Sequence, residues 1–329
     1  MSSMNEFGTV PQVEVTILAD RLADMLARSS DGVKRFSSGP LIAEHGFSAL
    51  IALPSEDLRI LWDAGASPST VLENLRRMEI DPASIDVIAL SHGHGDHTGG
   101  VSEILRTVCR PPALKMFPAG TADEALADYA KPATIPLIVH PAAFRERWNF
   151  LKDGRRRGPM SPTNRGEWEA LGAHVVEAEE PYRIAEGCWA TGYVPRESFE
   201  TEGRAPERLR YREGARFHPD DIDEDQSIVI HVEGKGLVVV SGCAHSGIVN
   251  TVWHARKMAG VETVHAVLGG FHLGRSTEKE VARTVEAIVE ARPAIIVPTH
   301  CTGFDAMRCF ASRMPDAFVL GTVGTTFTF

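Results

Sequence analysis

A cluster of metal-binding residue types lies near the end of the first third of the chain. His92, His94, Asp96 and His97 fall within six consecutive positions. In extended backbone, side chains two residues apart point to the same side, so His92 and His94 can bind one metal ion. Asp96 and His97 follow a glycine turn and can bind a second ion. Imidazole and carboxylate ligands suit zinc, iron or manganese.

The flanking elements place this cluster where ligands gather in layered α/β proteins. The apolar run at residues 85–90 predicts a buried strand that ends just before the cluster. Glycines mark a tight turn, and a helical pattern with apolar residues begins at position 101. The cluster is therefore expected at the carboxyl end of a strand and at the start of a helix. The alternation of predicted strands and helices along the chain indicates a layered α/β fold.

The His-x-His-x-Asp-His pattern after a strand resembles the signature of the metallo-β-lactamase fold superfamily. Asp63, at the end of an earlier predicted strand, resembles the family's aspartate that supports the metal loop, and His300 resembles its late histidine ligand. Four segments more narrowly resemble the 7,8-dihydropterin-6-yl-methyl-4-(β-D-ribofuranosyl)aminobenzene 5'-phosphate synthase-like branch, namely residues 44–48, 241–251, 269–273 and 298–303. The resemblance implies an αββα sandwich, in which two mixed β-sheets pack face to face with helices outside.

The resemblance also implies a set of metal ligands. In the family, one ion is held by the first two histidines of the motif and a later histidine. The second ion is held by the motif's aspartate, its third histidine and the late histidine, and a carboxylate usually bridges both ions. By this pattern His92 and His94 bind the first ion. Asp96, His97 and His300 bind the second.

The sequence departs from the family pattern at two positions. The region that normally carries the middle histidine, residues 191–196, contains none. Cys243 takes the place of the bridging aspartate, and His245 lies two residues further on. We expect His245 to supply the missing imidazole, whereas Cys243 is either a ligand or a small buried residue that lines the site. The sequence therefore leaves open whether the site binds one or two metal ions per chain. Zn2+ is expected, with Mn2+, Fe2+ or Mg2+ as alternatives.

Further residues near these motifs are candidates for catalysis and for contact with substrate. His272 follows a predicted strand and is interpreted either as a proton donor or as a structural histidine. Asp96 is expected to orient a water molecule in addition to binding metal. The candidates for substrate binding, which are equally consistent with structural or surface roles, are His45, Arg196, Asp225 and Cys301.

Composition and charge argue against several classes of partner. The formal net charge of −10 argues against nucleic acid, because phosphate binding requires a basic surface. The sequence has no apolar run long enough to cross a membrane and no secretory signal pattern at its start. Five cysteines without framework spacing fit a reducing cytoplasm. We therefore expect a cytoplasmic protein. Its partner is expected to be a small anionic substrate, phosphate-bearing or pterin-like. The sequence leaves open whether the chain forms a homo-oligomer.

The organisation of the chain is predicted to be simple. Residues 1–12 are expected to form a flexible tail, and residues 13–329 a single domain with inserted loops at about 151–166 and 200–226. The first loop is rich in arginine, which is typical of a solvated loop or of a loop that binds an anionic substrate.

These residues predict a metal-dependent hydrolase. Metal-bound hydroxide would attack a phosphoester, ester or lactone of a small anionic substrate. The branch resemblance implies an alternative, a synthase-like transferase in which the metal assists the displacement of pyrophosphate. A third hypothesis is a non-catalytic, metal-dependent ligand sensor, whose expected mark would be an eroded ligand set.

Overall fold

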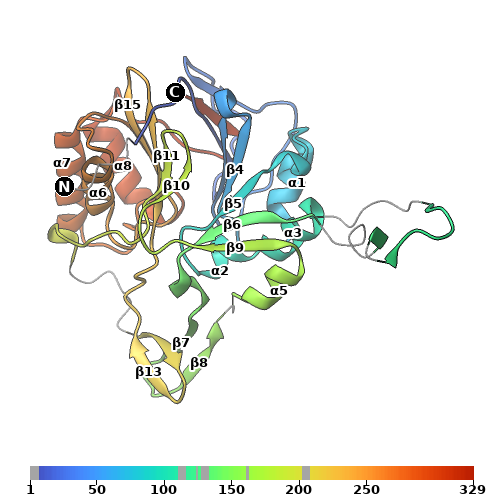
Figure 1. Cartoon of the computed structure of the whole chain (residues 1–329). Coiled ribbons are helices and arrows are strands. Elements are labelled where there is room, and N and C mark those ends of the chain that lie inside the picture. The colour runs from blue at the N-terminus through green and yellow to red at the C-terminus, as the bar shows by residue number, and fades with distance from the viewer. Residues whose placement is uncertain (1–6, 110–115, 124, 127–132, 161–162, 202–207) are drawn as a thin grey trace, which may run out of the picture.

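The computed structural model describes residues 7–109, 116–123, 125–126, 133–160, 163–201 and 208–329. In these residues the chain forms two large sheets that face one another, and a small sheet that projects beyond them (Figure 1). Helices lie on the outer faces of the large sheets, so the layers follow the order helix, sheet, sheet, helix. The predicted αββα sandwich is confirmed.

The first large sheet contains the strand that leads into the histidine cluster. Its strands lie in the order β2-β18-β1-β3-β4-β5-β6-β9. The pairs from β4 to β9 are parallel, and the pairs from β2 to β4 are antiparallel. The bounds are β1 Glu14–Ala19, β2 Val33–Arg35, β3 Ser48–Leu53, β4 Leu58–Trp62, β5 Val87–Ala89, β6 Ile135–Val139, β9 Ala173–Glu177 and β18 Thr325–Thr328.

The second large sheet is built largely from the carboxyl-terminal half of the chain. Its strands lie in the order β10-β11-β14-β15-β16-β17, and β15, β16 and β17 are parallel. Their bounds are β10 Tyr182–Ala185, β11 Cys188–Ala190, β14 Ser227–Val232, β15 Gly236–Ser241, β16 Val264–Gly270 and β17 Ile295–Thr299. Parallel strands end at one edge of a sheet, so the loops after β15, β16 and β17 meet there.

Helices bury apolar stripes against the outer face of each large sheet. Three pack on the first sheet and are α1 Thr70–Arg77, α3 Val101–Val108 and α5 Arg165–Ala170. Three pack on the second sheet and are α6 Ile248–Ala259, α7 Glu278–Ala291 and α8 Phe304–Arg313. The shorter elements are α2 Gly95–Thr98, η1 Pro54–Glu56, η2 Pro82–Ser84, η3 Pro141–Phe144, η4 Phe199–Thr201 and η5 His300–Thr302.

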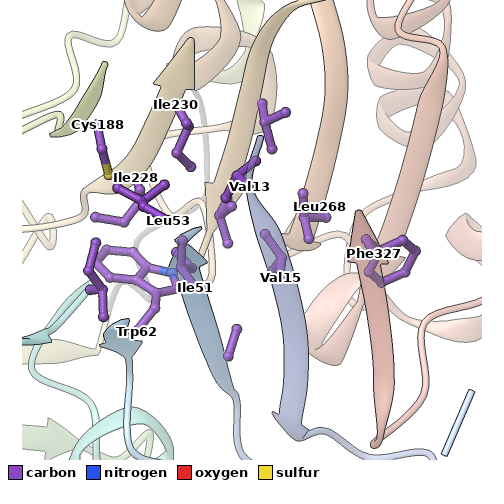
Figure 2. Packing of buried hydrophobic residues seen from close by; sticks show 14 of the residues in the cluster. Val13, Val15, Ile51, Leu53, Trp62, Cys188, Ile228, Ile230, Leu268 and Phe327 are labelled. Atoms are coloured by element: carbon purple, nitrogen blue, oxygen red, sulfur yellow. The ribbon is translucent and has the colours of Figure 1, made fainter. Parts of the chain in front are cut away.

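The main apolar core lies between the two large sheets. Figure 2 shows Ile51, Leu53 and Trp62 of the first sheet packed toward Ile228 and Ile230 of the second. These side chains are at most 1% exposed. Burial of this inner layer from both sides holds the strand ends of the two sheets in a constant relative position.

Replacing Phe327 by alanine should destabilise this core strongly. Phe327 lies on β18, is fully buried, and packs within the cluster between the sheets. Deleting a buried phenylalanine side chain leaves a cavity and costs about 3–5 kcal/mol of unfolding free energy. Urea denaturation measures the loss. Phe304→Ala is the control, because Phe304 is 71% exposed and its removal should cost under about 0.5 kcal/mol. Equal losses in both variants would contradict the prediction.

The small sheet corrects the prediction of two inserted loops. Part of residues 151–166 and part of residues 200–226 join β7, which precedes both ranges, in an antiparallel sheet in the order β13-β12-β7-β8. The bounds are β7 Glu146–Phe150, β8 Arg156–Met160, β12 Leu209–Glu213 and β13 Arg216–Pro219. Residues 161–162 and 202–207 lie outside the described residues. The arginine-rich composition suggested loops, but the cross-strand partners come from two insertions about sixty residues apart and stabilise each other only after folding.

The prediction of a flexible tail is wrong for residues 7–12, whereas residues 1–6 lie outside the described residues. Phe7 is 7% exposed and stacks on Trp189 with ring centroids 5.5 Å apart. N of Val10 donates to O of His231 at 2.9 Å, and Val10 is fully buried. The favourable free energy of burying the side chains of Phe7 and Val10 orders this segment, although the sequence around it includes polar residues. No helix within the described part of the chain is long and apolar enough to cross a membrane.

Candidate metal centre

The predicted metal ligands come together at one edge of the sandwich. His92 and His94 follow β5, and Asp96 and His97 lie on the short helix α2. The loops after β15, β16 and β17 bring residues 243–245, 272 and 300 to the same edge. Strand ends from both large sheets therefore meet at this edge, in the arrangement that the family resemblance implied.

Two groups of donor atoms lie in this site and share one sulfur. The first group is His92, Cys243 and His245, and the second is His97, Cys243 and His300. Within each group, the donor atoms lie within 4.8 Å of one another, and all of these residues are buried. Cys243 occupies the position predicted for the bridge, and His245 stands beside His92 in place of the missing middle histidine.

The distances within the groups are short. Nε2 of His92 lies 3.2 Å from Nε2 of His245. Nε2 of His97 lies 3.2 Å from Nε2 of His300 and 3.1 Å from Sγ of Cys243. Each group therefore has two ring nitrogens and a sulfur directed at a common space.

Asp63 orients the two histidines that belong to the motif. Its Oδ2 accepts a hydrogen bond from Nδ1 of His97 at 2.7 Å and another from Oγ of Ser91 at 2.7 Å. A carboxylate only accepts, so the hydroxyl hydrogen of Ser91 points to Asp63. Oγ of Ser91 then accepts from Nδ1 of His92, 2.8 Å away. Both hydrogen bonds occupy Nδ1, so Nε2 is the ring nitrogen that each histidine directs to the site and with which it can bind a metal ion.

The donor set fits a divalent transition-metal ion. Nε2 of His92 faces Nε2 of His245, and Nε2 of His97 faces Nε2 of His300 and Sγ of Cys243, which is the arrangement that a cation with several ligands requires. Imidazole and thiolate together favour zinc over magnesium, which prefers oxygen ligands. Metal binding would also hold Cys243 as a thiolate, against the burial that raises the pKa of its free thiol well above the usual value.

Burial keeps most of these histidines neutral, as metal ligands must be. Desolvation lowers the pKa of His92 and His245 well below the usual value, and that of His94 to about 3. His97 differs, because Asp63 and Asp96 outweigh the desolvation that lowers its pKa and raise it to about 9. The same carboxylates would favour a metal cation at its Nε2 in place of the proton.

Backbone strain gathers around the site. Asp63, His272 and His300 have φ of 58°, 50° and 47°, values in the left-handed region that residues with a side chain rarely adopt. N of His300 donates to Oδ1 of the buried Asp20 at 2.9 Å, which helps to hold this conformation. Such positions persist only where the surrounding structure determines them, and they gather at functional sites.

Comparison with known proteins identifies the family. A relative from Methanocaldococcus jannaschii, 7,8-dihydropterin-6-methyl-4-(β-D-ribofuranosyl)-aminobenzene-5'-phosphate synthase, is 30% identical over 284 residues, which cover 85% of this chain and 88% of that protein. A family model described as the metallo-beta-lactamase superfamily matches residues 42–108. The chain belongs to the metallo-β-lactamase superfamily.

Two further proteins resemble this chain. An uncharacterized protein of the same archaeon, MJ0448, is 31% identical over 283 residues, which cover 86% of this chain and 92% of that protein. The solved structure of Tm1679, a metal-dependent hydrolase of the β-lactamase superfamily, matches with a TM-score of 0.69 at 21% identity and covers 96% of this chain and 98% of that chain. This structural likeness shows the shared fold. The present chain is an enzyme of the metallo-β-lactamase superfamily, and metal ions are implied by that membership.

The remaining members of the predicted ligand set lie at the edges of the two donor groups. The ring of His94 is 4.5 Å from that of His92 and 4.9 Å from that of His245, measured between centroids. Oδ2 of Asp96 is 3.5 Å from Nε2 of His300. Burial raises the pKa of Asp96, but the nearby His97 and His300 together lower it by more. The net pKa is below the usual value, so the carboxylate stays ionised. Both residues therefore adjoin the donor groups, and their role as metal ligands stays a prediction.

The predicted catalytic and substrate-binding residues divide into two sets. His272 lies beside His245 with ring centroids 4.3 Å apart, and Sγ of Cys301 is 3.3 Å from Sγ of Cys243. His45 is exposed, with Nε2 3.8 Å from Oδ2 of Asp96. These three residues adjoin the donor groups.

The other two predicted contacts support the backbone of neighbouring loops. Oδ2 of the buried Asp225 accepts from N of Ser246 at 2.8 Å, one residue after His245. Arg196 donates to the carbonyl oxygens of Asp221 and Ile222. A role of Asp225 or Arg196 in substrate binding stays a prediction.

Sequence reasoning missed three residues that contact the site from behind. Asp20 accepts a hydrogen bond from N of His300. Ser91 connects Asp63 to His92 through two hydrogen bonds. The buried Glu224 accepts a hydrogen bond from N of Gly93 at 3.3 Å. A signal for Asp20 was present, because it follows β1 just as Asp63 follows β4, with an apolar strand ending in an aspartate. Nothing local marks Glu224, since it lies in an acidic stretch typical of a surface loop.

Replacing Cys243 by serine should weaken metal binding in both groups, because they share its sulfur. We expect zinc affinity to fall about 10-fold or more, measured by competition with a chromophoric chelator. Cys309→Ser, a change on α8, is the control and should leave affinity unchanged. Since Cys301 is close enough to substitute, full zinc affinity in the double variant Cys243→Ser, Cys301→Ser would contradict the prediction.

Proposed function

We propose that this enzyme is a metal-dependent hydrolase that acts on a phosphoester, ester or lactone of a small anionic substrate. The observation that carries the proposal is the pair of donor groups that share Sγ of Cys243 and include the two histidines oriented by Asp63. Zinc is the preferred ion because imidazole and thiolate dominate the donor set. A bound zinc ion acidifies a water molecule and stabilises negative charge on a substrate oxygen.

Side chains beside the donor groups would carry the proton transfers. The carboxylate of Asp96 is partly exposed and ionised, so it can accept a hydrogen bond from the attacking water and orient it. His272 is half-buried beside His245 and can donate a proton to the leaving group. His45, whose side chain is 76% exposed and whose Nε2 lies 3.8 Å from Oδ2 of Asp96, would be available to contact an anionic group of the substrate.

A second candidate function is a synthase-type transfer. It is favoured by the 30% identity to the synthase from Methanocaldococcus jannaschii over most of both chains. In that reaction class, the same site would assist the departure of pyrophosphate from a pterin substrate, and an aminobenzene phosphate would take its place. The substrates would then be phosphate-bearing and pterin-like.

A comparison of substrates separates the two candidates. Zinc-loaded protein is assayed with bis(p-nitrophenyl) phosphate, p-nitrophenyl phosphate and a lactone. It is also assayed for pyrophosphate release from a dihydropterin pyrophosphate, with and without the aminobenzene phosphate. Hydrolysis that a chelator abolishes supports the hydrolase. Pyrophosphate release that requires both substrates supports the synthase. Wild-type protein that binds no metal under metal-replete expression would contradict both.

A further inference from the structure

One side chain of the small sheet reaches the body of the enzyme next to the metal loop. Arg147 lies on β7 and is 3% exposed, although most of the small sheet is open to solvent. Its Nη1 and Nη2 donate to the carbonyl oxygens of Ala143 and Ala142, each at 3.3 Å. Those two residues belong to the 3-10 helix η3 between β6 and β7, so the arginine ties the base of the small sheet to the connection that follows β6 of the first large sheet.

Glu224 links this arginine to the loop that carries the leading histidines. Its Oε1 pairs with Nη2 of Arg147 and accepts a hydrogen bond from N of Gly93 at 3.3 Å. A Cβ atom on Gly93 would lie 2.7 Å from Nη1 of Arg147 and 2.3 Å from O of Ala143. The loop between His92 and His94 therefore rests directly on the arginine, and only glycine fits there.

The charges behind the loop depend on Arg147 for their balance. Glu224 and Asp220 are at most 1% exposed, and Oδ2 of Asp220 lies 2.7 Å from Nε of Arg147. Removing the arginine would leave buried carboxylates without this partner, which is strongly unfavourable and forces the segment around them to move. The movement would reach the metal loop through Gln226, whose N donates to O of Ser91 at 3.0 Å.

We propose that Arg147 and Glu224 are positioning residues for the metal loop, and that the small sheet sets how tightly the site holds its ion by delivering Arg147. This inference rests on the proposed function only in that the loop must bind a metal. The physical basis is preorganisation, because His92 and His94 hold an ion in common only while the backbone between them keeps its shape.

Zinc affinity of the full chain tests the inference. Arg147→Met should raise the Kd for zinc about 10- to 100-fold, measured by competition with a chromophoric chelator, and should alter the visible spectrum of the Co2+-substituted protein. The matched control is Arg212→Met. Arg212 lies on β12 in the same small sheet and pairs with Glu146, and none of its described contacts is with Asp220, Glu224 or residues 91–97. Its replacement should leave both measurements unchanged.

Two further variants decide the matter if Arg147→Met does not fold. Arg147→Lys keeps the charge but not the several donors, so it should recover only part of the affinity. Glu224→Gln keeps an acceptor for N of Gly93 and weakens the ion pair, so its zinc affinity should fall between those of wild type and Arg147→Met. Wild-type affinity in Arg147→Lys and Glu224→Gln would overturn the inference. Absence of zinc binding by the wild-type chain would overturn the proposed function as well. If wild type binds zinc and His92→Ala does not, unchanged affinity in the Arg147 and Glu224 variants overturns this inference alone.

Discussion

Replacing His92 and His94 together by alanine should remove the metal and nearly all activity. His92 belongs to the first donor group, and the ring of His94 lies at its edge, 4.5 Å from that of His92. The double replacement leaves that group with only Cys243 and His245. A catalytic ion contributes several kcal/mol of transition-state stabilisation, so its loss should slow the reaction about 10³-fold. Plasma mass spectrometry of the dialysed protein gives the metal content. Hydrolysis of bis(p-nitrophenyl) phosphate, p-nitrophenyl phosphate and the lactone gives the rate.

A matched control separates ligand loss from a general effect of removing imidazoles. His174 lies exposed on β9, away from the donor groups, and His174→Ala should keep wild-type metal content and rate. The fold of the double variant is checked by circular dichroism. Full metal content in a folded His92→Ala, His94→Ala protein would rule out these residues as ligands.

Replacing Asp63 by asparagine should weaken metal binding without removing a ligand. Asparagine tolerates the left-handed backbone at this position, so the change tests charge and hydrogen bonding and avoids new strain. One of the hydrogen bonds that Asp63 accepts, from Ser91 or from Nδ1 of His97, would then face an amide N–H instead of an oxygen. We expect zinc affinity to fall about 10- to 100-fold, because His97 loses its fixed tautomer and orientation.

The readout for Asp63→Asn is the Kd for zinc together with the unfolding free energy of the metal-free protein. A buried donor left without an acceptor costs about 1–3 kcal/mol, so the metal-free protein should also be less stable. Asp86→Asn is the control, because Asp86 binds N of Arg59 in an exposed position just before β5. Unchanged zinc affinity in Asp63→Asn would show that Asp63 does not orient the ligands.

The metal motif was predictable because its members are close in sequence. His92, His94, Asp96 and His97 lie on one strand-to-helix connection, so local periodicity alone placed them at a strand end. The strands and helices around them were predictable for the same reason. Alternating apolar runs and helical stripes give a sufficient local signal, as for β15, α6 and α7. Asp63 and His300 were found by likeness to the family, which supplied the pairing of distant strand ends.

The small sheet could not be predicted, and neither could its role behind the metal loop. Its strands are rich in arginine, and β7 and β12 pair across about sixty residues, so neither carries a local signal. Arg147 and Glu224 look like surface charges in the sequence, yet both are buried.

The sequence by itself determined which residues can bind metal, which elements they follow and the class of fold, because these depend on residue type and on spacing over a few residues. Only the tertiary structure decided that Cys243 is common to both donor groups, that His245 faces His92, and that Arg147 supports the loop. Those relations depend on how the two large sheets and the small sheet pack together. Packing brings together residues that are far apart along the chain, and no local sequence pattern indicates such contacts.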